Sequence, residues 1–266
     1  MRENRPNKNN YRRPAPQPEA EENEGQLEGR NALTEALKSG RTIDKVFIAS
    51  GEIDRGLQRL AAQAKEAGAV VVPVDRRKLD AMSTTHAHQG VITLAAAHEY
   101  CSIDDILEEA AGRGETPLIV ICDELSDPHN LGAILRTAEC AGAHGVIIPK
   151  RRSVGLTAVV AKASAGAVEY MKVARVTNIN TAIQELKEKG VWIFGTAAEG
   201  SIPMYQADLT GPTAIVIGSE GDGMSQLVRK NCDVTVHIPM KGRISSLNAS
   251  AAASILLYEA VRQRLS

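Results

Sequence analysis

Short apolar runs alternate with longer amphipathic segments from Pro117 to the end of the chain, and this alternation restricts the fold more than any other feature. Strands that alternate with helices in this way form a mostly parallel sheet covered by helices on both faces. We therefore expect an α/β domain whose ligands bind at the carboxyl ends of its strands. The apolar runs begin at Leu118, Val146, Val191, Ala214 and Val234.

The segment after the last of these runs has the layout of a ligand site. An apolar strand pattern from Val234 to Ile238 ends in the polar loop Met240 to Ser245, which holds one glycine and two cations. Ser246 and Asn248 then precede a helix rich in small residues, and either side chain is a suitable cap for it. A helix start leaves backbone N–H groups free to face a bound molecule. Taken by itself, the pattern also fits an ordinary capped helix.

A glycine-rich loop lies upstream, directly after the apolar run from Ala214 to Ile217. In this loop a single carboxylate, Glu220, is flanked by Gly218, Gly221 and Gly223. Glycines permit positive φ and let a ligand approach the backbone closely. The spacing matches neither the dinucleotide-binding fingerprint nor a phosphate-binding P-loop, so the loop alone also fits a plain strand-to-helix turn.

A third block has the same order of a strand, a polar turn and a helix. Its apolar run spans Leu118 to Cys122, and the helix is predicted from Leu131, with Asn130 at the N-cap position. Arg136 projects from the polar face of this helix and, taken alone, fits a solvated surface cation. The apolar face consists of Leu131, Ile134, Leu135 and Ala138.

Three blocks, taken together, resemble the motifs of the SpoU branch of the SPOUT methyltransferases: PHNLGAILRTAE, IGSEGDGMS and IPMKGRISSLNASAA. The resemblance covers roughly Leu27 to Leu265. It implies an enzyme that moves a methyl group from S-adenosylmethionine to a ribose 2′-hydroxyl of RNA. Within the family, the chain looks most similar to the enzymes that act on a guanosine in the peptidyl-transferase P loop of 23S rRNA. The resemblance also implies a homodimer. It further implies a C-terminal trefoil knot, although general rules of chain topology disfavour knots.

The resemblance also implies roles for individual residues. Family pattern casts Arg136 as the base, but a guanidinium stays protonated, so we expect it to bind the phosphate beside the target and stabilise developing negative charge. His129 is the titratable alternative base, although a turn histidine without a catalytic role is the simpler interpretation. In the active site the resemblance places Asn130, Arg136, Glu220, Ser246 and Asn248. Around the cofactor it places Thr196, Gly218, Ile238, Met240 and Leu247.

Three segments precede the catalytic domain, which we expect to span residues 117–266. Residues 1–26 lack hydrophobic periodicity, which predicts a disordered tail, either passive or a basic arm that touches RNA. Residues 27–97 alternate strand and helix patterns, and the resemblance implies an RNA substrate-binding domain similar to the ribosomal L30e type. Residues 98–116 hold a linker helix capped by Ser102.

Composition fits an enzyme of the cytoplasm. Hydrophobic residues make up 43% of the chain, which suffices for a core, yet no apolar stretch approaches the ~20 residues of a membrane span. The N-terminus has no apolar signal region, and the four cysteines show no C-x-x-C pairing, which indicates reduced thiols. A zinc site is suggested by residue type alone, but the spacing is not compact and we expect no metal. The residues concerned are His86, His88, His98 and Cys101.

A net charge of −1 gives little support to RNA binding, because contact with phosphates needs clustered cations. Clusters occur at Arg76 to Lys78, at Lys150 to Arg152, and at Lys241 with Arg243. Each also fits a solvated surface, but the last two fall beside the predicted site.

Two other classes of protein fit parts of the sequence. One is a catalytically idle RNA-binding protein of ribosome assembly, against which the intact Arg136, Glu220 and Asn248 argue. The other is a nucleotide-dependent oxidoreductase, whose GxGxxG fingerprint does not follow the first catalytic-domain strand. Among methyltransferases, tRNA or another rRNA loop is an open alternative substrate.

Overall fold

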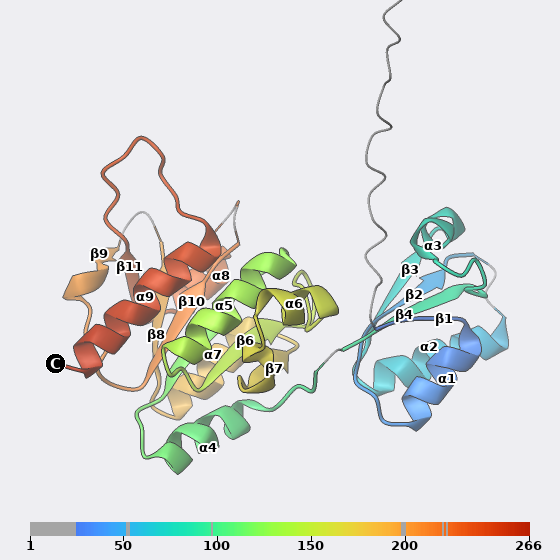
Figure 1. The fold of residues 1–266 in the computed structure, drawn as a ribbon, viewed down its shortest axis with the longest axis horizontal. Helices are drawn as coiled ribbons and strands as arrows, with labels where there is room; N and C mark the ends of the chain where they lie inside the picture. Colours follow the sequence, from blue (N-terminus) through green and yellow to red (C-terminus); the bar gives the residue numbers. More distant parts are fainter. Residues whose placement is uncertain (1–24, 52–53, 97, 198–200, 220, 222) are drawn as a thin grey trace, which may run out of the picture.

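The computed structural model describes all residues except 1–24, 52–53, 97, 198–200, 220 and 222, and it contains two sheets with their own helices (Figure 1). The N-terminal sheet has the strand order β1-β4-β2-β3, in which β2 and β3 are parallel and β4 is antiparallel to both of its neighbours. Its elements are β1 (Gln26–Glu28), α1 (Arg30–Lys38), β2 (Ile43–Ala49), α2 (Arg55–Glu66), β3 (Val70–Val74), α3 (Arg76–Met82) and β4 (Val91–Ala95).

Two helices cover one face of this small sheet and one helix covers the other. Leu33 of α1 and Leu57 of α2 are buried in one cluster with Val46 of β2. Leu79 of α3 and Ile92 of β4 are buried in a second cluster on the opposite face. The sheet already begins at Gln26, the last residue of the segment predicted as tail, and residues 1–24 of that segment lie outside the described residues.

The C-terminal sheet has seven strands, all paired in parallel, in the order β7-β6-β5-β10-β8-β11-β9. The predicted mostly parallel sheet is therefore confirmed. Its elements are α4 (Ile103–Arg113), β5 (Leu118–Cys122), α5 (Pro128–Cys140), β6 (Gly145–Pro149), α6 (Ala158–Ala163), β7 (Val173–Val176), α7 (Ile179–Glu188), β8 (Trp192–Thr196), β9 (Ile202–Pro203), β10 (Thr213–Ile217), α8 (Gln226–Asn231), β11 (Val234–His237) and α9 (Ala249–Arg264). Short 3-10 turns lie at Ala167–Glu169 and Met204–Gln206.

Helices sandwich this sheet. One core cluster joins α5, α6 and α9 to the sheet, and a second joins α4, α7 and α8 to the opposite face. Figure 1 shows α5 and α9 side by side across the sheet. Every residue of β5 and β10 is buried, because these central strands are covered on both faces and carry continuous apolar sequences. The linker helix α4 begins as predicted, with Ser102 and Asp105 in a reciprocal capping box.

A buried ion pair joins the two sheets. Arg175 of β7 contacts Asp44 of β2 with an Nη1–Oδ1 distance of 2.6 Å, and both side chains are 5% exposed. The Tyr100 hydroxyl donates a hydrogen bond of 2.9 Å to Asp44 Oδ1 and accepts one of 2.8 Å from the backbone N–H of Leu156. The guanidinium of Arg175 lies 5.2 Å from the centre of the Tyr100 ring, a distance typical of cation–π contact. We call Asp44, Tyr100 and Arg175 the interdomain clamp.

Within the described part of the chain, no helix has the length and apolar character needed to cross a membrane. The same residues contain no group of three or more His, Cys, Asp or Glu side chains that could hold a metal ion. His88 has a structural environment: its Nε2 lies 2.9 Å from Asp80 Oδ1, and its Nδ1 accepts a hydrogen bond from the N–H of Gly90.

Candidate functional site

A hollow lies at the carboxyl ends of three neighbouring strands, β10, β8 and β11. It consists of two adjoining cavities of about 530 and 560 Å³. Parallel α/β sheets bind ligands at this edge, where the loops after the strands converge. We call it the edge hollow; both cavities are lined by Thr196, Ala197, Ser245, Ser246, Leu247 and Ala252.

All five residues predicted to surround the cofactor line the edge hollow. Thr196, Ile238, Met240 and Leu247 line the first cavity, and Gly218 lines the second. They come from the ends of three different strands and from the start of α9, so the fold brings together segments that are far apart in the sequence. Their individual roles stay predictions.

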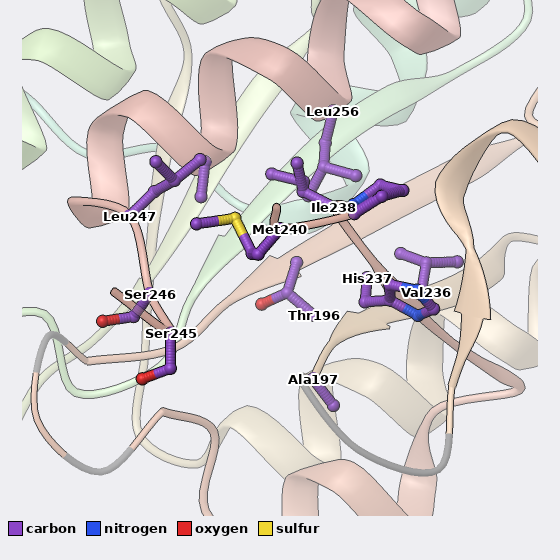
Figure 2. A pocket seen from close by; sticks show the side chains of 12 residues that line it. Thr196, Ala197, Val236, His237, Ile238, Met240, Ser245, Ser246, Leu247 and Leu256 are labelled. Carbon is purple, nitrogen blue, oxygen red and sulfur yellow. The ribbon is translucent and has the colours of Figure 1, made fainter. Parts of the chain in front are cut away.

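The lining of the first cavity is mainly apolar. Met240 and Leu247 are each 40% exposed, and Figure 2 shows the Met240 side chain directed toward Leu247. Leu256 of α9 and Ile238 lie on the opposite side of Met240 from Leu247, while Ser245 and Ser246 lie on the loop that leads into α9 (Figure 2). Exposed large apolar side chains beside backbone polar groups suit a ligand with both an apolar body and polar edges.

The glycine-rich loop after β10 folds back on itself. Ser219 and Gly223 exchange two backbone hydrogen bonds, of 3.0 and 3.2 Å. A Cβ atom at Gly218 would lie 2.2 Å from the carbonyl carbon of Gly223 and 2.3 Å from the N atom of Met224. Glycine at 218 is thus required by the loop's own backbone, in addition to the ligand approach inferred from sequence. The predicted active-site carboxylate Glu220 lies outside the described residues.

The first and third motifs meet through a pair of asparagines. Asn248 Nδ2 donates a hydrogen bond of 2.9 Å to Asn130 Oδ1. Asn248 Oδ1 accepts from the N–H groups of Ser250 and Ala251, at 2.9 and 3.3 Å, so Asn248 is the N-cap of α9, as one of the two sequence alternatives predicted. The other candidate cap, Ser246, is exposed and lines the edge hollow.

The start of α5 differs from the prediction. The helix begins at Pro128, and its N-cap is Asp127, whose Oδ1 accepts a 2.9 Å hydrogen bond from the N–H of His129. The prediction that Asn130 caps a helix from Leu131 is therefore wrong. Proline is favoured at the first helical position because its φ is already helical and its missing N–H has no partner to lose there. Asn130 instead lies inside the first turn, 6% exposed, where its side chain contacts Asn248.

Arg136 and His129 lie away from the lining. Arg136 is exposed on the surface of α5 and lines neither cavity of the edge hollow. His129 is exposed at the start of the same helix. The structure therefore brings Asn130, Ser246 and Asn248 together beside the edge hollow, while the contribution of Arg136 stays a prediction.

Sequence reasoning missed several lining residues, among them His237. Its Nδ1 lies 2.9 Å from the Ser201 hydroxyl, which also donates to the carbonyl of Ala197. The signal was present, because His237 is the last residue of β11 and strand ends at this edge are where ligands bind. Asp123, at the end of β5, was also missed; its Oδ2 accepts a 2.8 Å hydrogen bond from the N–H of Ser225 and so holds the second motif loop.

Comparisons with known proteins agree with this architecture. A family model described as the SpoU rRNA Methylase family matches residues 117–258, and one described as RNA 2'-O ribose methyltransferase substrate binding matches residues 26–101. A Bacillus subtilis (strain 168) protein named "Putative TrmH family tRNA/rRNA methyltransferase YacO" is 48% identical over 236 residues, which cover 89% of this chain and 94% of that protein. A protein from Staphylococcus haemolyticus (strain JCSC1435), named "Putative TrmH family tRNA/rRNA methyltransferase", is 47% identical over 236 residues, which cover 89% of this chain and 94% of that protein.

Solved structures of similar fold contain the expected cofactor. The SpoU methyltransferase AviRb from Streptomyces viridochromogenes, in complex with AdoMet, has a TM-score of 0.58 and 26% identity, with 90% of each chain covered. An AdoMet-bound rRNA methyltransferase from Sinorhizobium meliloti has a TM-score of 0.56 and 26% identity, covering 91% of this chain and 88% of that one. The chain therefore belongs to the SpoU, or TrmH, family of S-adenosylmethionine-dependent RNA methyltransferases.

Proposed function

We propose that this protein methylates the 2′-hydroxyl of a ribose in structured RNA, and that its target is a guanosine in the peptidyl-transferase P loop of 23S rRNA. The observation that carries the proposal is the edge hollow, where the predicted cofactor residues lie beside the Asn130–Asn248 contact. The family model that matches residues 117–258, described as the SpoU rRNA Methylase family, supports an rRNA target, and the choice of the guanosine rests on the resemblance of the sequence motifs. The names of the relatives keep tRNA as a second candidate substrate.

The edge hollow suits S-adenosylmethionine. Met240, Leu247 and Leu256 offer apolar contact to an adenosyl group, and the backbone beside Gly218 and Ile238 offers N–H and C=O groups to the edges of adenine. When bound, the cofactor supplies a methyl group that is already electrophilic. The protein has then to orient the ribose oxygen in line with that methyl group and to exclude water.

Side chains beside the edge hollow and on α5 divide this task. The Asn130–Asn248 pair holds the start of α9 in a fixed orientation, and Ser246 presents a hydroxyl on the rim. Arg136 binds the phosphate next to the target ribose and stabilises negative charge on its oxygen, as a permanently charged guanidinium can. The ribose hydroxyl loses its proton as its oxygen takes the methyl group and the bond from that methyl group to sulfur breaks. His129, exposed at the start of α5 and one residue before Asn130, is the proton acceptor in this proposal.

The fold beyond the edge hollow is also part of the proposal. In the sheet, β8 lies between β10 and β11. After β11 the chain crosses back over β8, and α9 packs against β10 and α5. This return supports a C-terminal trefoil knot. The long loop between β11 and α9 extends away from the sheet (Figure 1). We further propose that the N-terminal unit, similar to the ribosomal L30e type, binds the RNA substrate; the match of residues 26–101 to a substrate-binding model supports this.

We also propose a homodimer that forms through the catalytic domain. A stripe on α9, Ala251, Ile255, Tyr258 and Arg262, is exposed at helical spacing, and it includes two large apolar side chains. Light scattering at micromolar concentration is expected to report twice the chain mass for the wild type. Ile255→Glu combined with Tyr258→Glu is expected to give a folded monomer, and an unchanged dimer mass in that variant would place the interface elsewhere.

The test of the function uses two transcripts, the 23S rRNA peptidyl-transferase region and an unmodified tRNA, with methyl-labelled S-adenosylmethionine. We expect label on a guanosine 2′-oxygen of the rRNA transcript. Arg136→Ala is expected to slow single-turnover transfer by on the order of 10²–10³ without changing the cofactor Kd, because an exposed charge needed at the reacting oxygen is removed. Label on tRNA alone would support the second substrate, and transfer to neither RNA would favour an idle RNA-binding protein.

A further inference from the structure

A separate cavity, of about 410 Å³, lies in the cleft between the two sheets. One wall comes from the end of α2 and the start of β3, around Lys65 and Gly68. The other wall comes from Lys150 and Arg151, which follow β6, and from Thr177, which follows β7. The cleft therefore opens at the same carboxyl edge of the large sheet as the edge hollow.

The cleft concentrates unpaired positive charge. Lys65, Lys150 and Arg151 line it, and no carboxylate does. Across the described residues, none of these three has a carboxylate within 4.0 Å, whereas the next cation, Arg152, forms a 3.0 Å ion pair with Glu124. Like charges that gather without partners in a concave surface attract an anion.

The geometry of the cleft is fixed by the fold. The Lys150 ammonium reaches across to the N-terminal unit, where a Cβ placed on Gly68 would lie 3.5 Å from Nζ. The Lys150 backbone N–H donates a 2.8 Å hydrogen bond to Val176, and its carbonyl accepts one of 3.5 Å from Arg175 of the interdomain clamp. The clamp thus sets the relation between the walls that carry these cations.

We propose that this interdomain cleft binds the phosphodiester backbone of the RNA substrate through Lys65, Lys150 and Arg151. The proposal rests on the proposed function, because it adds a contact for the same RNA. β6 and β8 are three strand positions apart in the sheet, so the cleft lies roughly 14 Å along the carboxyl edge from the edge hollow. One RNA can therefore occupy the cleft and present a ribose to the edge hollow at the same time.

The chemistry of the lining favours phosphate over a base. Apart from the three cations, the lining consists of Thr177 and of small or apolar residues such as Ala62, Gly68 and Val70. It contains no aromatic side chain on which a base could stack and no amide or carboxylate side chain that reads base edges. Binding at this cleft is accordingly independent of sequence and dependent on salt.

The test measures the Kd of the full-length protein for the rRNA transcript and for the tRNA transcript over a series of KCl concentrations. The variant Lys65→Gln/Lys150→Gln/Arg151→Gln is expected to raise the Kd for the bound transcript on the order of tenfold or more. It should also lower the salt slope by about 1 for each phosphate that the variant can no longer neutralise. Its S-adenosylmethionine affinity should match the wild type, because the edge hollow is lined by other residues.

Two further variants separate charge at the cleft from charge in general. Lys65→Arg/Lys150→Arg/Arg151→Lys keeps all three charges and should keep the wild-type slope. A control that removes three exposed cations outside both the cleft and the N-terminal unit should also keep it; these are Arg113→Gln, Lys162→Gln and Lys230→Gln. Equal salt slopes for the wild type and the neutral cleft variant would contradict the proposal that the cleft binds RNA phosphates, and would leave the proposed function intact. A wild type that binds neither transcript would overturn the proposed function together with that proposal.

Discussion

At the scale of single residues, Asn248 connects helix capping to the arrangement of the active site. Its Oδ1 caps α9 and its Nδ2 donates to Asn130. Asn248→Ala removes both interactions, and loss of the cap alone is expected to cost about 1 kcal/mol of stability, the usual value when an N-cap side chain is deleted. Asn248→Asp keeps a capping oxygen but loses the N–H that donates to Asn130, so we expect it to be destabilised by about 1 kcal/mol through that hydrogen bond alone.

Both variants are expected to lose methyl transfer, measured as single-turnover rates beside thermal unfolding. A stable Asn248→Asp variant with wild-type rates would show that the Asn130 hydrogen bond has no part in the reaction.

The same two asparagines show how far the sequence predicts the site. The sequence predicted that Asn130 and Asn248 belong to one site, but it assigned Asn130 a capping role, because Asn is a good cap and the polar turn was expected to extend up to it. The structure instead starts the helix at Pro128 with Asp127 as its cap.

At the scale of elements, the loop after β10 depends on Gly218. An added Cβ would clash with the backbone of Gly223 and Met224, so Gly218→Ala must displace the turn that lines the edge hollow. We expect S-adenosylmethionine affinity to fall at least tenfold in calorimetric titration, while the buried β10 keeps the domain folded. Gly211→Ala is the matched control, since Gly211 lies in the loop before β10 and its added methyl group meets open space. Equal affinities in the two variants would contradict this account.

The loop between α3 and β4, which contains Thr84 and Thr85, depends on the ionisation of Glu28 at the end of β1. Burial opposes ionisation, but hydrogen bonds from Ser83, Thr85 and Thr84 together outweigh it and hold the pKa of Glu28 below its usual range. Because the folded-state pKa is depressed, this contribution to stability is complete above the unfolded pKa of about 4.3 and is lost as pH falls further, toward the folded pKa.

We expect the stability difference between the wild type and Glu28→Gln to be constant from pH 7 to about pH 5 and to shrink below about pH 4.3. Urea unfolding at each pH measures that difference, and amide hydrogen exchange of Thr84 and Thr85 reports the loop directly. A difference that grows as the solution becomes more acidic would refute the role given to the Glu28 carboxylate.

The elements differ in how well the sequence predicts them. The linker helix and the central strands β5 and β10 have strong signals, a capping box or a continuous apolar run, and the structure places them close to the predicted bounds. Strand β7 and the two-residue β9 were not predicted, because so few residues carry little periodicity. Such short strands are defined by the neighbours with which they pair.

At the scale of the whole molecule, the sequence predicts that the motif loops meet, because each follows a strand of one parallel sheet. It does not predict the strand order, which places β10 between β5 and β8. Nor does it predict the interdomain clamp, because Asp44 and Arg175 are 131 residues apart and each, in its local sequence, is an ordinary strand residue. Contacts of this kind follow from the assembled fold and have no local pattern.

The interdomain clamp leads to a prediction for the docking of the two units. Asp44 Oδ2 and Arg175 Nε are buried without a hydrogen-bond partner in the described structure, so the ion pair is only partly satisfied. Removal of one partner from a buried pair typically costs about 3–5 kcal/mol, while replacement of both by neutral groups costs far less. Arg175→Met is therefore expected to separate the units, and Asp44→Asn/Arg175→Met is expected to restore most of the docking.

Small-angle scattering should detect this as a larger radius of gyration for Arg175→Met at pH 7, together with two melting transitions in place of one. Burial raises the pKa of Asp44, while Arg175, Tyr100 and Lys45 lower it. Removal of Arg175 takes away the largest of the lowering effects, so the pKa of Asp44 rises further. A raised folded-state pKa means that the docked form holds the proton more tightly than the separated form. Docking of Arg175→Met should therefore recover as pH falls from 7 toward the ordinary Asp pKa of about 3.9. If its radius of gyration equals that of the wild type at pH 7, the clamp does not hold the two units together.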